Sequence, residues 1–185
     1  MALNNHTRRK CFISYHHADE AEVQEFIDDF DHARDVLIAR GIGASMSGDI
    51  INSDSSDYIM SQIREKYLRG TTVTIVLVGK CTWSRKYVDW EMAASLRNTS
   101  AYSRNGLLAI TLPSVAALSR RRVPPRLDDN ISGHENDEGY ARWWKYPKSS
   151  ADLASRIEIA HSYRATRSDL VNNRRALRVN NATCA

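Results

Sequence analysis

The stretch Thr72-Val-Thr-Ile-Val-Leu-Val-Gly79 is the clearest strand in the sequence. It is β-branched and apolar without a regular polar alternation, so a strand here would be buried on both faces. Such strands are typical of parallel sheets that helices cover on both sides. The apolar run of residues 73–78 is far too short to cross a bilayer. We therefore expect a globular α/β protein built around this strand.

On the N-terminal side, residues 10–15 form a second short apolar run, which predicts a buried strand. A polar cluster follows it, and Asp19 is a candidate N-cap. Apolar residues then recur at helical spacing through residues 20–40, so we expect one long helix that ends at Gly41. A weak strand at 42–46, a polar loop at 47–56 and a helix at 57–69 complete this half.

On the C-terminal side, the sequence predicts a helix at 87–97 and a strand at 107–112 that Pro113 ends. Residues 114–139 are rich in Asp, Asn, Gly and Pro, which indicates a long irregular segment. A late strand at 140–146 and a last helix at 151–167 follow. The polar stretch 168–185 is expected to be partly frayed.

Strands that alternate with helices predict an α/β fold with a parallel sheet and helices on both faces. The chain has 185 residues, which suits one domain. We expect that domain at 1–168, with an irregular insertion at 113–139, and a polar, Arg-rich C-terminal tail at 169–185.

Composition restricts the protein's location and partners. No apolar segment of the kind found in secretory signals follows the basic N-terminal residues. Cys11, Cys81 and Cys184 are odd in number and far apart, so we expect no disulfide framework and a cytoplasmic location. The net charge of +4 is a weak indication of anionic partners. The basic clusters lack interleaved aromatic residues, so we expect a solvated surface, with neither a nucleic acid nor a membrane as partner.

Parallel sheets bind ligands at the carboxyl ends of their strands. That rule selects three loops, at 16–20, 45–57 and 80–86, which should meet at one edge of the sheet. Glu91 lies one turn into the helix that follows the third loop, close to Trp83 and Trp90. A carboxylate there could stabilise an oxocarbenium-like sugar while the two indole rings stack on a flat ligand. The alternative is an acidic residue that only suits the dipole of its helix.

Other common sites are not supported by the sequence. Residues 128–133 match the start of an EF-hand loop, but Gly139 stands where the bidentate Glu should be. His16 and His17 are adjacent and point in different directions, which makes them a poor metal site. The sequence has no Walker A, GxGxxG or GxSxG pattern. We therefore expect no metal and no cofactor.

Two motifs resemble those of a known family. Cys11-Phe-Ile-Ser-Tyr-His-His-Ala-Asp19 is similar to the first strand and loop of TIR-like domains. The strand at 73–78, Gly79 and the segment Thr82-Trp-Ser-Arg-Lys-Tyr-Val-Asp-Trp-Glu91 resemble the second hallmark of one TIR-like branch. That branch includes the ThsB-type proteins of the Thoeris antiphage system. The resemblance covers residues 8–112.

The resemblance implies a flavodoxin-like fold and an enzyme that breaks the nicotinamide–ribose bond of NAD, with NAD as substrate and not as cofactor. The product would be a cyclic or conjugated ADP-ribose that activates a separate effector protein. A phage-derived trigger and self-association on activation are also expected. Glu91 would be the catalytic residue. The nucleotide pocket would include Ser14, Tyr15, His16, Asp19, Asp49 and Asn52.

Two other functions stay open at this point. One is an NAD glycohydrolase that only depletes NAD, and the other is a non-catalytic TIR module that acts in assembly as a scaffold. A scaffold would not need a carboxylate in a cleft, so Glu91 distinguishes it from either enzyme.

Overall fold

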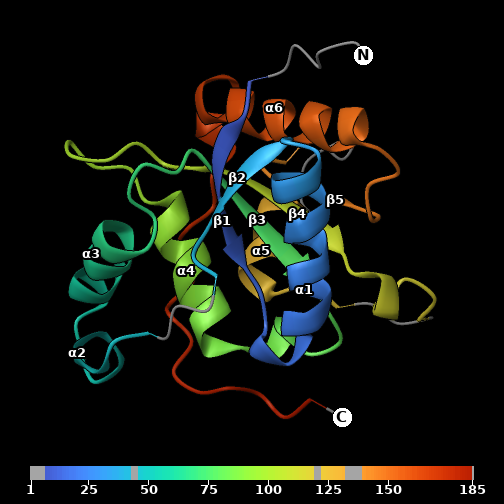
Figure 1. The fold of residues 1–185 in the computed structure, drawn as a ribbon. Coiled ribbons are helices and arrows are strands. Elements are labelled where there is room, and N and C mark those ends of the chain that lie inside the picture. The colour runs from blue at the N-terminus through green and yellow to red at the C-terminus, as the bar shows by residue number, and fades with distance from the viewer. Residues whose placement is uncertain (1–6, 43–45, 119–121, 132–138, 185) are drawn as a thin grey trace.

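A computed structural model describes residues 7–42, 46–118, 122–131 and 139–184. Its centre is a parallel sheet in the order β2-β1-β3-β4-β5 (Figure 1). The strands are β1 (Arg9–Ser14), β2 (Leu37–Arg40), β3 (Val73–Val78), β4 (Gly106–Thr111) and β5 (Arg142–Trp144). This order is that of flavodoxin-like folds. The predicted fold class is therefore confirmed.

Helices cover both faces of the sheet. On one face lie α1 (Glu20–Ile27) and α6 (Ser150–Thr166), and on the other lie α4 (Lys86–Leu96) and α5 (Pro125–Ile131). The helices α2 (Gly48–Ile51) and α3 (Ser56–Lys66) pack against the outer side of α4. Figure 1 shows α3 and α4 on one side of the strands and α1 on the other.

The central strand β3 explains why these layers hold together. It pairs with β1 on one side and β4 on the other, and all of its residues are buried. Ile75 and Leu77 pack with the side chains of α1 and α6, whereas Val76 and Val78 pack with α4 and α5. Successive side chains of a strand point to opposite faces, so one apolar run supplies both cores.

The prediction of one long helix at 20–40 is wrong. The helix α1 ends at Ile27, a π-helical turn spans Asp28–Ala33, and β2 follows at Leu37–Arg40. Asp35 has a φ of 52°, a left-handed conformation that Asp tolerates better than most residues and that a helix does not. The expected strand at 42–46 is replaced by β2, and residues 43–45 lie outside the described residues.

Gly41 therefore follows a strand and not a helix. Its φ is 84°, and a β-carbon there would lie 2.2 Å from the ring of Phe12. The glycine thus lets the chain turn tightly over β1.

Two segments expected to be irregular contain helices. Residues 47–56 include the short helix α2, which buries Ile50, and residues 113–139 include α5, which buries Arg126 and Leu127. In the second segment Pro124-Pro125 indicated a loop, but Pro125 is the first residue of α5. Proline suits that position because the first helical N–H has no partner within the helix. Residues 119–121 and 132–138 lie outside the described part of the insertion.

The tail expected to fray is packed on the domain. After the short 3-10 helix Ser168–Leu170, the chain runs along α4 and α5, and the indole N–H of Trp90 donates to the carbonyl of Arg178 at 2.9 Å. Cys184 at its end forms a disulfide with Cys81. The expectation that the protein has no disulfide is therefore wrong, because residues separated by 103 positions meet at one edge of the sheet.

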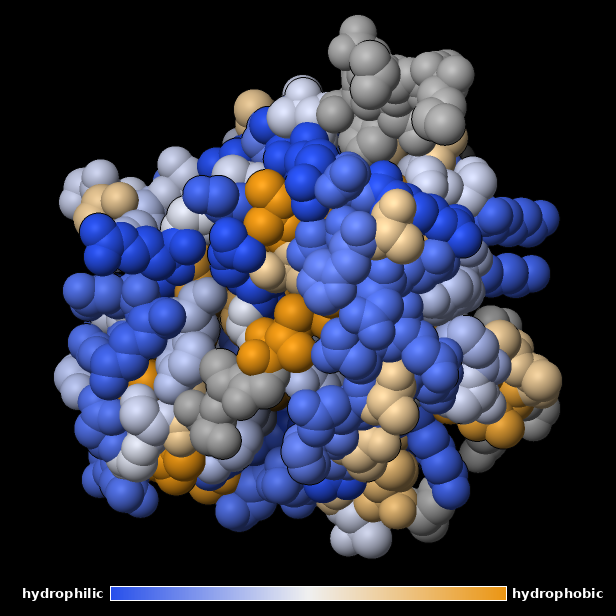
Figure 2. Space-filling model, in the orientation of Figure 1, coloured by the Kyte–Doolittle hydropathy of each residue, from blue (hydrophilic) through white to orange (hydrophobic). Residues whose placement is uncertain are grey.

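The surface in the view of Figure 2 is mainly hydrophilic, with small and separate apolar areas. Among the described residues, the large apolar side chains that are exposed are Tyr58, Leu118 and Val179. They come from three distant parts of the chain. None of the helices in the described part of the chain has both the length and the apolar composition that a membrane crossing needs.

Candidate functional site

A pocket of about 450 Å³ lies where the three selected loops meet. This volume is within the range of small-molecule sites. The first loop contributes Tyr15 and His16, the second Met46 and Ile51, and the third runs into α4. The expectation that these loops share one edge of the sheet is confirmed. The pocket is lined by Ile13, Tyr15, His16, His17, Glu20, Gly41, Met46, Ile51, Arg85, Tyr87, Val88, Glu91 and Asn181.

Glu91 lies in this pocket, on the second turn of α4. The hydroxyl of Ser14, the last residue of β1, donates to its Oε2 at 2.6 Å. Burial raises the pKa of the Glu91 carboxyl to about 7, and the hydrogen bond from Ser14 offsets part of that effect. Among the described residues no Arg, Lys or His forms an ion pair with Glu91. The carboxyl is therefore desolvated without a compensating cation, and a carboxyl perturbed in this way in a pocket is a candidate functional residue.

The first loop lies beside this carboxyl. Tyr15 and His16 line the pocket, as predicted. Burial, together with the nearby Arg85 and His17, lowers the pKa of His16, which favours its neutral imidazole. Ser14 is buried behind the pocket and reaches it through its bond to Glu91.

Asp19 connects the first loop to the third. It accepts a hydrogen bond from the hydroxyl of Thr82 at 3.4 Å, and that hydroxyl also accepts from the N–H of Gly79 at 2.9 Å. A β-carbon on Gly79 would lie 2.1 Å from Oδ2 of Asp19, so only glycine allows this approach. Burial raises the pKa of Asp19. Asp19 does not line the pocket, and its position indicates that it fixes the two loops together.

The structure does not bring the two polar residues of the second loop to the pocket. Asp49 on α2 pairs with Lys66 at 3.1 Å and accepts from the hydroxyl of Tyr58 at 3.0 Å, on the outer side of α3. Asn52 is exposed at the end of α2. The loop instead presents Ile51 and Met46 to the pocket, because α2 turns its apolar side inward.

Neither tryptophan lines the pocket. Trp90 is 4% exposed and packs among α2, α3 and α4, with its ring against that of Tyr87. Trp83 lies beneath the guanidinium of Arg122, which is 4.7 Å from the ring centroid. The expectation that they stack on a ligand does not agree with this placement. Trp90 is one residue from Glu91, so its side chain points about 100° away around the helix.

The C-terminal segment supplies a pocket residue that sequence reasoning missed. The side-chain oxygen of Asn181 accepts from the N–H of Lys86, the first residue of α4, at 2.8 Å. The N–H of Ala182 donates to the carbonyl of Ser84 at 2.9 Å, and the Cys81–Cys184 disulfide follows. The segment thus forms part of the pocket wall. Only the pair of cysteines could have indicated this, and their spacing alone gave no reason to join them.

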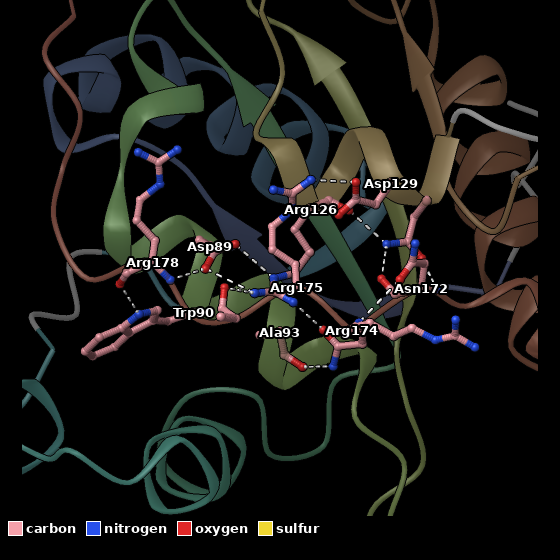
Figure 3. A network of polar contacts seen from close by, with 12 residues as sticks. Asp89, Trp90, Ala93, Arg126, Asp129, Asn172, Arg174, Arg175 and Arg178 are labelled. Carbon is pink, nitrogen blue, oxygen red and sulfur yellow. Dashed lines mark hydrogen bonds and ion pairs between the residues drawn. The ribbon is translucent and has the colours of Figure 1, made fainter.

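A buried ion pair anchors this segment on the other side of α4 (Figure 3). Arg126 of α5 donates two hydrogen bonds to Asp89, at 2.9 and 3.2 Å, and the N–H of Arg178 donates a third at 2.8 Å. Arg126 also donates to Asn173 and to the carbonyl of Ala176. Figure 3 shows Asp89, Arg126 and Arg178 close together between α4, α5 and the C-terminal segment.

The fold and this pocket define a class: an α/β domain with a ligand pocket at the carboxyl ends of its parallel strands. A comparison with models of protein families matches residues 12–117 to "Thoeris protein ThsB, TIR-like domain". The match covers more than half of the chain, so the protein belongs to this family of TIR proteins of Thoeris antiphage defence. A comparison with curated proteins gave no match.

Proposed function

We propose that the protein is an enzyme that cleaves the nicotinamide–ribose bond of NAD in antiphage defence. The observation that carries this proposal is the Glu91 carboxyl, which is desolvated, has no cationic partner among the described residues and lies in a pocket of about 450 Å³. Membership in the Thoeris TIR family supports the same conclusion.

The proposed chemistry needs little more than this carboxylate. The bond between the ribose C1′ and the nicotinamide nitrogen breaks, and its electron pair leaves with the nicotinamide, which becomes neutral. The ribose is left with oxocarbenium character, and the ionised Glu91 stabilises that charge across a poorly hydrated pocket. With a pKa of about 7, roughly half of the Glu91 carboxyls are ionised near neutral pH.

The fate of the ribosyl group decides the product. Attack by a nucleophile of the same molecule gives a cyclic ADP-ribose, attack by another acceptor gives a conjugate, and attack by water gives plain ADP-ribose. The pocket walls from Ile13, Met46 and Ile51 are apolar and keep water away from one side, which favours the first two outcomes. We propose that such a product activates a separate effector protein in the cytoplasm.

The experiment that tests this proposal is product analysis. The protein is incubated with NAD, alone and with extract from phage-infected cells, and the products are identified by mass spectrometry. A cyclic or conjugated ADP-ribose supports the proposal. Plain ADP-ribose as the only product supports the glycohydrolase. Intact NAD under both conditions contradicts an enzyme and favours an assembly module.

Two variants make this experiment specific. Glu91→Gln should abolish the product, whereas Asp49→Asn makes the same carboxylate-to-amide change outside the pocket and should leave it. Chromatography of the same samples measures self-association, which we propose accompanies activation by a phage-derived trigger. Assembly that is lost in Glu91→Gln would contradict a purely chemical role for Glu91.

A further inference from the structure

Arg85 is a pocket residue whose charge the contacts described above do not use. It immediately precedes α4 and lines the pocket. Its Nε is shielded from solvent and has no hydrogen-bond partner among the described residues. A buried N–H without an acceptor is costly, and a charged one more so. Arg85 also forms no ion pair among the described residues, so the charge of its guanidinium is available to an anionic ligand in the pocket.

The neighbours of Arg85 do not supply this acceptor. Beyond the effect of burial, the positive charge of Arg85 contributes to the lowered pKa of His16 and offsets part of the rise in the pKa of Asp19, so Arg85 lies near the first loop. Asp19 nevertheless bonds to Thr82 and forms no ion pair with Arg85. Glu20 is an acid of the same loop and, unlike Asp19, it lines the pocket. Its carboxylate lies 3.1 Å from Nδ1 of His17.

Arg85 and Glu91 lie in different parts of the pocket. Burial and the Ser14 hydroxyl account for the raised pKa of Glu91, and Arg85 has no resolved effect on it. Arg85 immediately precedes α4 and Glu91 lies six positions later on that helix, so their backbones are about 9 Å apart along the helix axis. A ligand that contacts both must therefore carry an anionic group separate from the group that meets Glu91.

The surroundings of Arg85 favour an anion. Of the described residues that line the pocket, Arg85 is the only Arg or Lys. It stands at the N-terminus of an eleven-residue helix, where the dipole adds positive potential. The acid in the first turn of that helix, Asp89, is engaged by Arg126 on the other face.

We propose that Arg85 binds the diphosphate of a dinucleotide substrate and so determines specificity for diphosphate-bearing nucleotides. This inference rests on the proposed function, which places the nicotinamide ribose at Glu91. A guanidinium suits the task because its planar donors match phosphate oxygens in pairs. The roles of the two residues are separate: Arg85 holds the substrate, and Glu91 acts on the bond that breaks.

The test measures binding of ADP-ribose, which carries the diphosphate but no nicotinamide, by calorimetry. Arg85→Gln should weaken binding about tenfold or more, and Arg85→Lys should recover part of it. The matched control is Lys86→Gln, which removes the same charge from the next residue. The Lys86 side chain lies over the rings of Tyr87 and Trp90 and does not line the pocket. Lys86→Gln should therefore change the affinity for ADP-ribose less than about threefold.

Equal effects of Arg85→Gln and Lys86→Gln, or no binding by the wild-type protein, would overturn the inference. Cleavage of NAD in the same preparations separates the two proposals. If the wild type cleaves NAD and Arg85→Gln binds ADP-ribose normally, this inference fails alone. If ADP-ribose binding depends on Arg85 but NAD stays intact, the proposed function fails alone. Thermal unfolding of each variant verifies that it is folded.

Discussion

The two faces of α4 carry two carboxylates with opposite surroundings. Asp89 faces α5 and the C-terminal segment, is 3% exposed, and accepts two hydrogen bonds from Arg126 and one from the N–H of Arg178. Glu91, two positions later, faces the pocket and accepts one hydrogen bond, from Ser14. Positions two apart on a helix point about 200° from each other, so one helix serves two different environments.

The difference separates a carboxylate with a structural role from one for which we propose a chemical role. The charge of Asp89 is compensated within the fold, and its partners connect α4, α5 and the C-terminal segment (Figure 3). The charge of Glu91 is not compensated by a cation in the described residues, so burial raises its pKa to about 7. A carboxyl in that state changes its charge near neutral pH and can stabilise a cation that forms only during a reaction.

The largest expected effect comes from removing the structural carboxylate. Asp89→Ala leaves the guanidinium of Arg126, itself 1% exposed, buried without a counter-charge. We expect the free energy of unfolding to fall by about 3–5 kcal/mol, measured by urea denaturation. Adding Arg126→Met should restore part of the loss, because it removes the unpaired charge. A loss below about 1 kcal/mol would mean that the two carboxylates are equivalent.

A somewhat smaller effect should appear in the pH dependence of stability. The Glu91 pKa is about 7 in the folded protein and 4.5 in the ordinary state, so the folded protein binds more protons between these values. Its free energy of unfolding should therefore fall as pH rises from 4.5 to 7, by roughly 3 kcal/mol. Glu91→Gln should lack this component, so the difference between wild type and variant across pH measures it. If the unfolding free energies of the wild type and Glu91→Gln change in parallel with pH, the Glu91 carboxyl does not have the raised pKa described here.

The smallest effect concerns the segment that Asp89 helps to hold. Cys184→Ser removes the disulfide to Cys81, which closes a loop of 103 residues, but leaves the contacts of Asp89 with Arg178. We expect the unfolding free energy to fall by about 2 kcal/mol, the lower end for such links, because the freed end can detach alone. Denaturation of the wild type with and without a dithiol reductant provides the same comparison. An unchanged unfolding free energy, both in Cys184→Ser and in the reduced wild type, would show that Cys81 and Cys184 do not form a disulfide.

The elements that could be predicted from the sequence are those whose local residue pattern fits only one kind of structure. The β-branched run at Val73–Val78, apolar except for Thr74, predicted the central strand, and the loops at the strand ends predicted where the pocket lies. Glu91 was singled out because it lies one turn into the helix that follows that strand, within a segment that resembles a TIR-like motif. The boundary between α1 and β2 was missed because Val36 and Leu37 fit a helical stripe as well as a strand, and only the conformation of Asp35 separates them.

The rest depends on contacts between distant residues. Asp89 and Arg126 are 37 positions apart, and nothing near either residue indicates the pairing. The same holds for Asn181 in the pocket wall and for Cys81 with Cys184. Trp90 was misjudged for a related reason: its neighbour in sequence points into the pocket, whereas its own ring packs against α2 and α3.

The most direct test of the different roles of these carboxylates is the rate of nicotinamide release from NAD by the wild type and Glu91→Gln, at pH 7.5 under conditions in which the wild type turns over. We expect the variant to be about 100-fold slower or more, with a free energy of unfolding no lower than that of the wild type. A variant that releases nicotinamide at the wild-type rate would contradict the role assigned to Glu91.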